Sequence, residues 1–210
     1  MLTLYDFPRA PSPRRARVFL AEKGVAHDTV IVDLAIAEQF GEAFRAINPR
    51  CTLPALALGD GTVLTDNAGI HAYLEAAYPQ PPLLGVTPVE QADIASWNSR
   101  IETDGFLAVA EALRNSAPAM KGRALAGPVD YEQIPALAER GMARIGQFFQ
   151  MLNTHLEGRA FIATDRFSLA DISAYIVVDF ARVVRARPAD TLANLSRWRD
   201  AIAARPSMAL

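Results

Sequence analysis

Four prolines fall within ten residues, at Pro79, Pro81, Pro82 and Pro88, and this cluster limits the possible folds more than any other feature of the chain. Proline has a fixed φ and no backbone N–H, so such a segment cannot continue a helix or a sheet ladder. We therefore expect a linker over residues 79–88 between one domain over 1–78 and another over 89–210. A chain of 210 residues is long enough for two small domains.

Before the linker, apolar strand patterns alternate with helical ones, which predicts an α/β unit. The expected strands cover residues 2–5, 29–32, 55–58 and 63–64, and the expected helices lie near 13–23, 37–46 and 67–77. Gly59-Asp60-Gly61 is a turn signal between the last two strands. A hairpin beside a parallel pair would make a mixed four-stranded sheet.

After the linker, strand signals disappear and helical periodicity takes over, which predicts an all-α domain. Two apolar stripes carry this prediction: Ile145, Phe148, Phe149, Leu152 and Leu156, and then Ile172, Ile176, Phe180 and Val183. Ser168 followed three residues later by Asp171 is a capping-box variant that should start the second of these helices.

Composition excludes several classes of function. The chain has 21 Lys and Arg against 23 Asp and Glu, so it lacks the basic excess that nucleic-acid binding requires. No window is apolar enough for a membrane span, and we expect a cytoplasmic protein without a membrane partner. The single cysteine, Cys51, excludes an internal disulfide, and the three widely spaced histidines form no metal-ligand motif.

The start of the first helix carries an unusual charge pattern. Ser12 is a suitable N-cap and the proline after it a suitable first helical residue. Arg14 and Arg15 then fall in the first turn, where the helix macrodipole disfavours cations. A bound anion would make this arrangement favourable. The alternative is that the arginines are solvated or paired with Asp6 or Asp33.

Two further segments suggest a peptide-binding surface. In Thr52-Leu53-Pro54 a proline opens a strand, and a cis bond there would expose the N–H and C=O of the preceding residue. Farther along, Asp66 or Asn67 caps the helix over 67–77.

In their order and spacing these segments resemble the cytosolic glutathione transferases. The resemblance covers nearly the whole chain and rests on Leu4-Tyr5-Asp6-x-Pro8, Arg17-x-x-Leu20-Ala21-Glu22-Lys23-Gly24, Asn48-Pro49, Leu53-Pro54, Leu64-Thr65-Asp66-Asn67 and Ser168-Leu169-Ala170-Asp171-Ile172. It implies a thioredoxin-like N-terminal domain, an all-helical C-terminal domain and a homodimer. It also implies glutathione as co-substrate, a small hydrophobic electrophile as second substrate, and no cofactor or metal.

The resemblance also implies a glutathione site. The residue before the cis-proline pairs with the cysteinyl part of glutathione, which implies Leu53, flanked by Thr52 and Pro54. Two polar residues at the next helix start hold the γ-glutamyl end. The family usually has Glu or Gln followed by Ser there, and this chain has Asp66 and Asn67. Gln39 falls where the family often contacts the glycine carboxylate.

The largest departure from the family pattern concerns the thiol. The usual serine position is occupied by Ala10, which has no side-chain donor, and the nearest hydroxyl is that of Ser12. The segment is similar to an atypical subgroup in which the helix start and ordered water stabilise the thiolate. We expect Ser12, Arg14 and Arg15 to act on the sulfur together with the helix start.

In the helical domain, Phe106, Arg114 and Asn115 are the candidates for the electrophile pocket that the family forms there. Cys51 is misplaced for a nucleophile of the thioredoxin fold, and we expect an inert thiol. The alternative interpretation is a non-catalytic protein-binding or scaffolding module of the same fold, which Ala10 and the Asp66-Asn67 pair favour. The start of the first helix and Leu53-Pro54 favour the enzyme.

Overall fold

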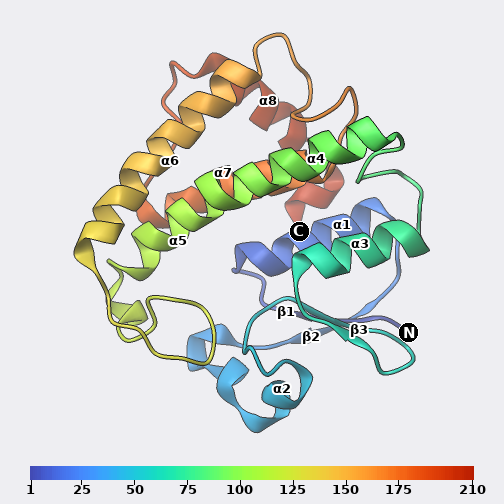
Figure 1. The fold of residues 1–210 in the computed structure, drawn as a ribbon, viewed down its shortest axis with the longest axis vertical. Helices are drawn as coiled ribbons and strands as arrows, with labels where there is room; N and C mark the ends of the chain where they lie inside the picture. The colour runs from blue at the N-terminus through green and yellow to red at the C-terminus, as the bar shows by residue number, and fades with distance from the viewer. The chain divides into compact units, whose positions relative to one another are not determined.

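The computed structural model describes residues 1–210 and contains two compact units (Figure 1). The first unit comprises residues 1–81 together with 126–129 and Leu210. The second comprises residues 82–125 and 130–209.

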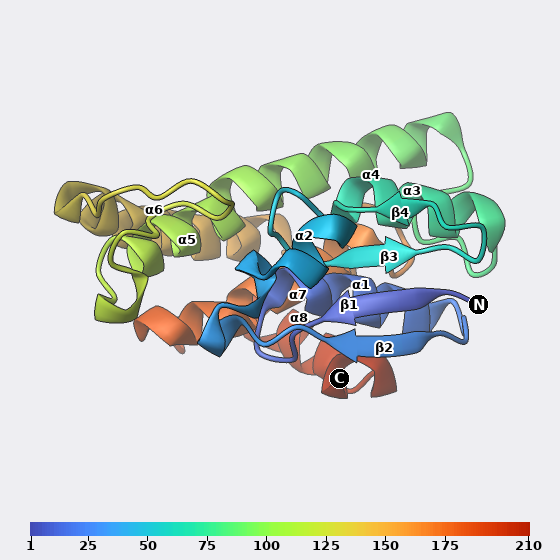
Figure 2. The same ribbon diagram turned by 90° about the horizontal axis from the view of Figure 1, so that it is seen from below.

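The first unit is a four-stranded mixed sheet with helices on both faces. Its elements are β1 (Thr3–Asp6), α1 (Pro11–Glu22), β2 (Asp28–Ile31), η1 (Leu34–Ile36), η2 (Glu38–Phe40), α2 (Glu42–Ile47), β3 (Ala55–Ala57), β4 (Val63–Leu64) and α3 (Asn67–Ala77). The strand order is β2-β1-β3-β4, with β1 parallel to β2 and antiparallel to β3, and β3 antiparallel to β4 (Figure 2). The predicted mixed sheet and its hairpin are confirmed.

Helices α1 and α3 lie side by side on one face of the sheet, and α2 lies on the other (Figures 1 and 2). Phe19 and Leu20 of α1 and Ile70 and Leu74 of α3 are fully buried. Each pair of these side chains contributes the apolar stripe that a surface helix needs to pack on a core. Gly24 ends α1 in the left-handed conformation, with φ of 63°.

The helix expected over residues 37–46 is wrong as a single element. Ala37 adopts φ of 61° and ends η1, and Gly41 is extended between η2 and α2. Two backbone interruptions therefore divide the segment into short helical pieces, although its residue types favour a continuous helix.

The second unit is all-helical, as predicted. Its elements are α4 (Pro88–Arg100), η3 (Ile101–Phe106), α5 (Leu107–Arg114), η4 (Pro118–Met120), α6 (Pro135–His155), α7 (Leu169–Phe180), η5 (Ala181–Val184), α8 (Ala193–Ala203) and η6 (Pro206–Ala209). The π-helical η3 joins α4 to α5 in one continuous rod (Figure 1). Helix α6 packs against α5 at Gly141, where an added Cβ would lie 2.6 Å from the Ala108 carbonyl oxygen and the Ala112 nitrogen.

Helix α7 is the most deeply buried helix of this unit and begins with the predicted capping box between Ser168 and Asp171. The Asp171 carboxylate accepts hydrogen bonds from the Ile162 and Ser168 backbone and from the Trp198 indole. Burial raises the pKa of Asp171 to about 6, although these hydrogen bonds act in the opposite direction.

The two predicted apolar stripes agree with the observed burial to different extents. All five predicted residues of the α6 stripe are buried. The second stripe holds at Ile172 and Ile176, but Val183 is 46% exposed because α7 ends at Phe180.

None of the helices combines the length and the apolar composition needed to cross a membrane. No three His, Cys, Asp or Glu side chains come together as a set of metal ligands.

Candidate functional site

Helix α1 begins two residues earlier than the sequence predicts, and this changes the role of Ser12. Its N-cap is Ala10, and Pro11 is the first helical residue. The prediction of Ser12 as N-cap is wrong because Pro11 suits the first position as well as Pro13 does, and the first turn also tolerates a missing N–H at Pro13. The cap makes no side-chain hydrogen bond, so the Ser12 hydroxyl is not used for capping.

The two prolines leave only one backbone donor in the first three positions of α1. Pro11 and Pro13 have no N–H, and the Arg14 N–H is bonded to the Ala10 carbonyl at 3.3 Å. The Ser12 N–H makes no backbone hydrogen bond. An anion at this helix start would therefore meet one amide hydrogen and one hydroxyl, both from Ser12.

An ion pair holds the loop that leads into α1. Arg17 donates from one guanidinium nitrogen to both oxygens of the buried Asp6 carboxylate, at 2.6 and 2.7 Å. A second nitrogen of Arg17 reaches the Pro8 carbonyl at 3.3 Å. These contacts join the end of β1 to the second turn of α1 and fix the path of the chain between them.

The expected pairing of Arg14 or Arg15 with Asp6 or Asp33 is wrong. Asp6 pairs with Arg17, and the Asp33 carboxylate caps η1 through the Ala35 N–H. Arg14 Nε donates to the Leu210 carbonyl at 3.0 Å. Arg15 is buried, with 4% of its surface exposed.

The charge of Arg15 acts on His71 of α3. Desolvation and the positive charge of Arg15 lower the pKa of His71 to about 3, although a hydrogen bond to the Arg15 backbone opposes this shift. The His71 ring also stacks on Phe19 with centroids 4.6 Å apart. His71 is therefore a neutral core residue of the α1–α3 interface.

The loop before β3 has the conformation that the peptide-binding hypothesis requires. The Leu53–Pro54 bond is cis. Neither the N–H nor the C=O of Leu53 takes part in a backbone hydrogen bond, since pairing of β3 with β1 begins at Ala55. Leu53 thus offers both main-chain groups to an extended peptide ligand.

Asn48 organises this loop, a role that the sequence analysis did not assign to it. Its amide nitrogen donates to the Thr52 carbonyl at 2.8 Å and to the Thr52 hydroxyl at 3.2 Å. Its amide oxygen accepts from the Arg50 N–H at 3.0 Å. The Asn-Pro dipeptide at 48–49 was the available signal, because asparagine side chains commonly fold back on the chain two residues later. Cys51 is buried beside these groups with its thiol toward the Pro49 carbonyl.

The start of α3 presents two different polar groups. Asp66 is its N-cap, with a carboxylate that is 60% exposed and lies 4.0 Å from the Arg50 guanidinium. Asn67 is the first helical residue and is only 9% exposed. Its amide nitrogen donates to the Ser12 carbonyl at 3.1 Å, while its amide oxygen is buried without a hydrogen-bond partner.

The other predicted site residues are Gln39 in the first unit and three residues of the second unit. Gln39 lies in η2, is buried, and its amide oxygen has no partner within the chain. In the second unit, Asn115 uses its nitrogen on the Glu111 carbonyl and its oxygen on the Ile134 N–H. Arg114 donates to the Arg123 carbonyl. Arg114 and Asn115 thus hold the loop between α5 and α6, whereas Phe106 is half-buried at the end of η3.

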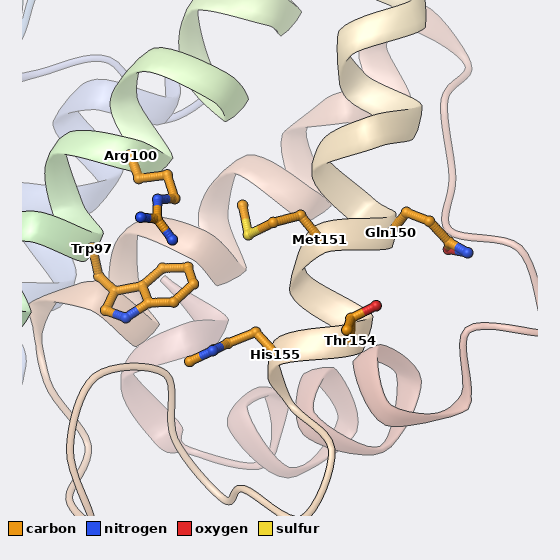
Figure 3. Close-up of a pocket in the computed structure, with 6 residues that line it drawn as sticks. All are labelled: Trp97, Arg100, Gln150, Met151, Thr154 and His155. Carbon is orange, nitrogen blue, oxygen red and sulfur yellow. The ribbon is translucent and has the colours of Figure 1, made fainter.

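A cavity of about 440 Å³ lies between α4 and α6 (Figure 3). The Trp97 and His155 rings meet with centroids 4.0 Å apart, and the Arg100 guanidinium lies 4.7 Å from the centre of the Trp97 ring. Burial is the main cause that lowers the pKa of His155, and the charges of Arg159 and Arg100 add to it. None of the predicted electrophile-pocket residues lines this cavity.

Comparison with known proteins decides the family. The model of the glutathione S-transferase N-terminal domain matches residues 10–77, and that of the glutathione S-transferase C-terminal domain matches residues 116–206. The chain belongs to the glutathione S-transferase family.

Full-length relatives agree with this assignment. Glutathione S-transferase 2 of Saccharomyces cerevisiae is 31% identical over 212 residues, which cover 99% of this chain and 88% of the relative. The crystal structure of Gtt2 from the same yeast has a TM-score of 0.89 at 30% identity and covers 99% and 98% of the two chains. A glutathione S-transferase domain-containing protein of Marinobacter aquaeolei also has a TM-score of 0.89, at 34% identity, covering 98% and 99%.

The family relationship confirms the resemblance and the fold class that it implied, with a thioredoxin-like first domain and a helical second domain. The protein is a glutathione S-transferase, and members of this family use glutathione as co-substrate.

Proposed function

We propose that this transferase ionises the thiol of glutathione at the start of α1 and transfers the sulfur to a small hydrophobic electrophile, by nucleophilic substitution or conjugate addition. The open main chain of Leu53 before the cis-proline supports the proposal most directly, because it can pair with the cysteinyl residue and direct its side chain. The exposed Asp66 carboxylate can accept from the γ-glutamyl ammonium. Gln39 and Thr52 are the proposed neighbours at the glycine end and beside the cysteinyl residue.

The contacts of Asn67 favour its main chain over its side chain as the donor to the γ-glutamyl carboxylate. The Asn67 side chain is turned toward Ser12, so its backbone N–H at the first position of α3 is the better donor. Helix starts favour carboxylates because their first N–H groups have no partner within the helix.

Energies show which groups are needed for the thiolate. Lowering a thiol pKa of about 8.5 by roughly 2 units requires about 2.7 kcal/mol. A helix dipole supplies about 0.3 to 1 kcal/mol, and each hydrogen bond to a charged group about 1.5 to 3 kcal/mol. The Ser12 N–H and hydroxyl together with the dipole are therefore sufficient. The guanidinium charges of Arg14 and Arg15 would add to the positive potential.

The test measures the ultraviolet absorbance of the bound thiolate against pH, in the parent and in Ser12→Ala. We expect a lowered thiol pKa in the parent and a rise in the variant, with matching losses in conjugation of an aryl halide. An unchanged pKa would remove the Ser12 hydroxyl from the mechanism. If the parent neither binds to immobilised glutathione nor turns over, and a stable protein partner is captured instead, the scaffolding alternative replaces the proposal.

We also propose that the protein is a cytoplasmic homodimer that serves in detoxification. Sedimentation of a monomer at micromolar concentration would contradict the dimer.

A further inference from the structure

One hydrogen bond connects the starts of α1 and α3 across 55 positions of sequence, from the Asn67 amide nitrogen to the Ser12 carbonyl. It joins the two places at which the proposed site would bind glutathione. The Ser12 residue supplies the only N–H among the first three positions of α1, and Asn67 supplies the first N–H of α3.

The placement of Asn67 is unfavourable for stability alone. Its side chain is more than nine-tenths buried, and its amide oxygen has no partner. A buried amide with one unsatisfied group destabilises a fold relative to an apolar residue of similar size. The hydrogen bond to Ser12 is thus the contact for which an amide is needed at this position.

The prolines on both sides of Ser12 make this contact consequential. An ordinary helix start offers several adjacent N–H groups, so a small tilt of one of them matters little. Here a single N–H and its own hydroxyl must point at the sulfur, and hydrogen-bond energy falls steeply with angle. A contact that fixes the orientation of Ser12 therefore fixes both hydrogen-bond donors, its N–H and its hydroxyl.

We propose that Asn67 is a positioning residue: its side chain sets the orientation of Ser12 toward the thiol, while its backbone N–H takes the γ-glutamyl carboxylate. This inference rests on the proposed function. It makes the acidity of the thiol depend on a residue of the γ-glutamyl subsite that does not touch the sulfur.

The experiment uses Asn67→Ala, which keeps the backbone N–H, and the isosteric Asn67→Asp, whose carboxylate cannot donate to the Ser12 carbonyl. Two quantities are measured in the full chain: the pKa of the bound glutathione thiol, and the Kd of S-methylglutathione, which has no thiol to ionise. We expect the thiol pKa to rise by about 0.5 to 1 unit in Asn67→Ala and further in Asn67→Asp. The Kd of S-methylglutathione for Asn67→Ala should stay within about twofold of the parent.

Glu75→Gln is the matched control, because Glu75 joins α3 to the other end of α1 through Lys23. It should loosen the same pair of helices without moving the thiol pKa. An equal rise in Glu75→Gln, or no rise in either Asn67 variant, would overturn the positioning role and leave the proposed function intact. A parent whose bound thiol has the pKa of free glutathione would overturn both.

Discussion

The buried ion pair between Lys23 and Glu75 gives a stability prediction that is independent of catalysis. Lys23 Nζ lies 2.6 Å from a Glu75 oxygen and 2.6 Å from the Pro81 carbonyl, and the lysine side chain is fully buried. Removing the carboxylate of such a pair leaves a buried ammonium without an opposite charge, which destabilises a protein by about 3 to 5 kcal/mol. Glu75→Leu should therefore lose a large part of a typical total of about 5 to 15 kcal/mol.

The assay is urea and thermal unfolding of the parent, Lys23→Met, Glu75→Leu and the double variant. For a chain of this size each 1 kcal/mol shifts the Tm by about 2 to 4 °C, so Glu75→Leu should unfold roughly 10 °C earlier. The double variant should recover most of the loss, because two apolar side chains of similar volume replace a buried ion pair at little net cost. Double-variant losses equal to the sum of the two single losses would show that the pair is not coupled and would refute this reasoning.

Three further predictions concern single positions. Acidification from pH 6.5 toward 3 should destabilise the parent through His71, because the pKa of His71 is lowered in the folded state and the unfolded chain binds the extra proton. Urea unfolding should show that, by pH 5, the parent has lost about 2 kcal/mol more of its free energy of unfolding than His71→Gln has. Gly141→Ala should cost more than about 2 kcal/mol, since its Cβ would overlap the backbone at Ala108 and Ala112. Gly146→Ala in the same helix meets nothing within 4 Å and should raise the Tm through a gain of about 0.5 to 1 kcal/mol, so equal effects of the two alanines would contradict the packing argument.

Local signals account for most of the fold that the sequence predicted. The proline cluster, the alternation of strand and helix patterns, and the Ser168 to Asp171 capping box each depend on residues within a few positions of one another. Prediction failed where two local solutions were equally good. Both Pro11 and Pro13 suit a first helical turn, so the sequence could not place the N-cap.

The candidate site was only partly predictable for a different reason. Residue types single out Leu53, Pro54 and Asp66, and the family resemblance supplies the roles expected for them. The contact of Asn67 with Ser12, in contrast, joins segments far apart in sequence. Which end of an asparagine amide faces a distant carbonyl depends on how two helices pack, and neither helix encodes that separately. The prediction of a single helix over residues 37–46 failed for a related reason. Ala37 adopts the left-handed conformation, which alanine disfavours and which the local sequence does not predict.

The prolines of α1 also suggest how the reactivity of this enzyme could change over generations. Replacing the buried Pro13 by a small apolar residue would give the main chain a second donor beside Ser12, with no new functional group on any side chain. Thiol chemistry in this chain could thus be tuned by substitutions that an inspection of polar residues alone would overlook.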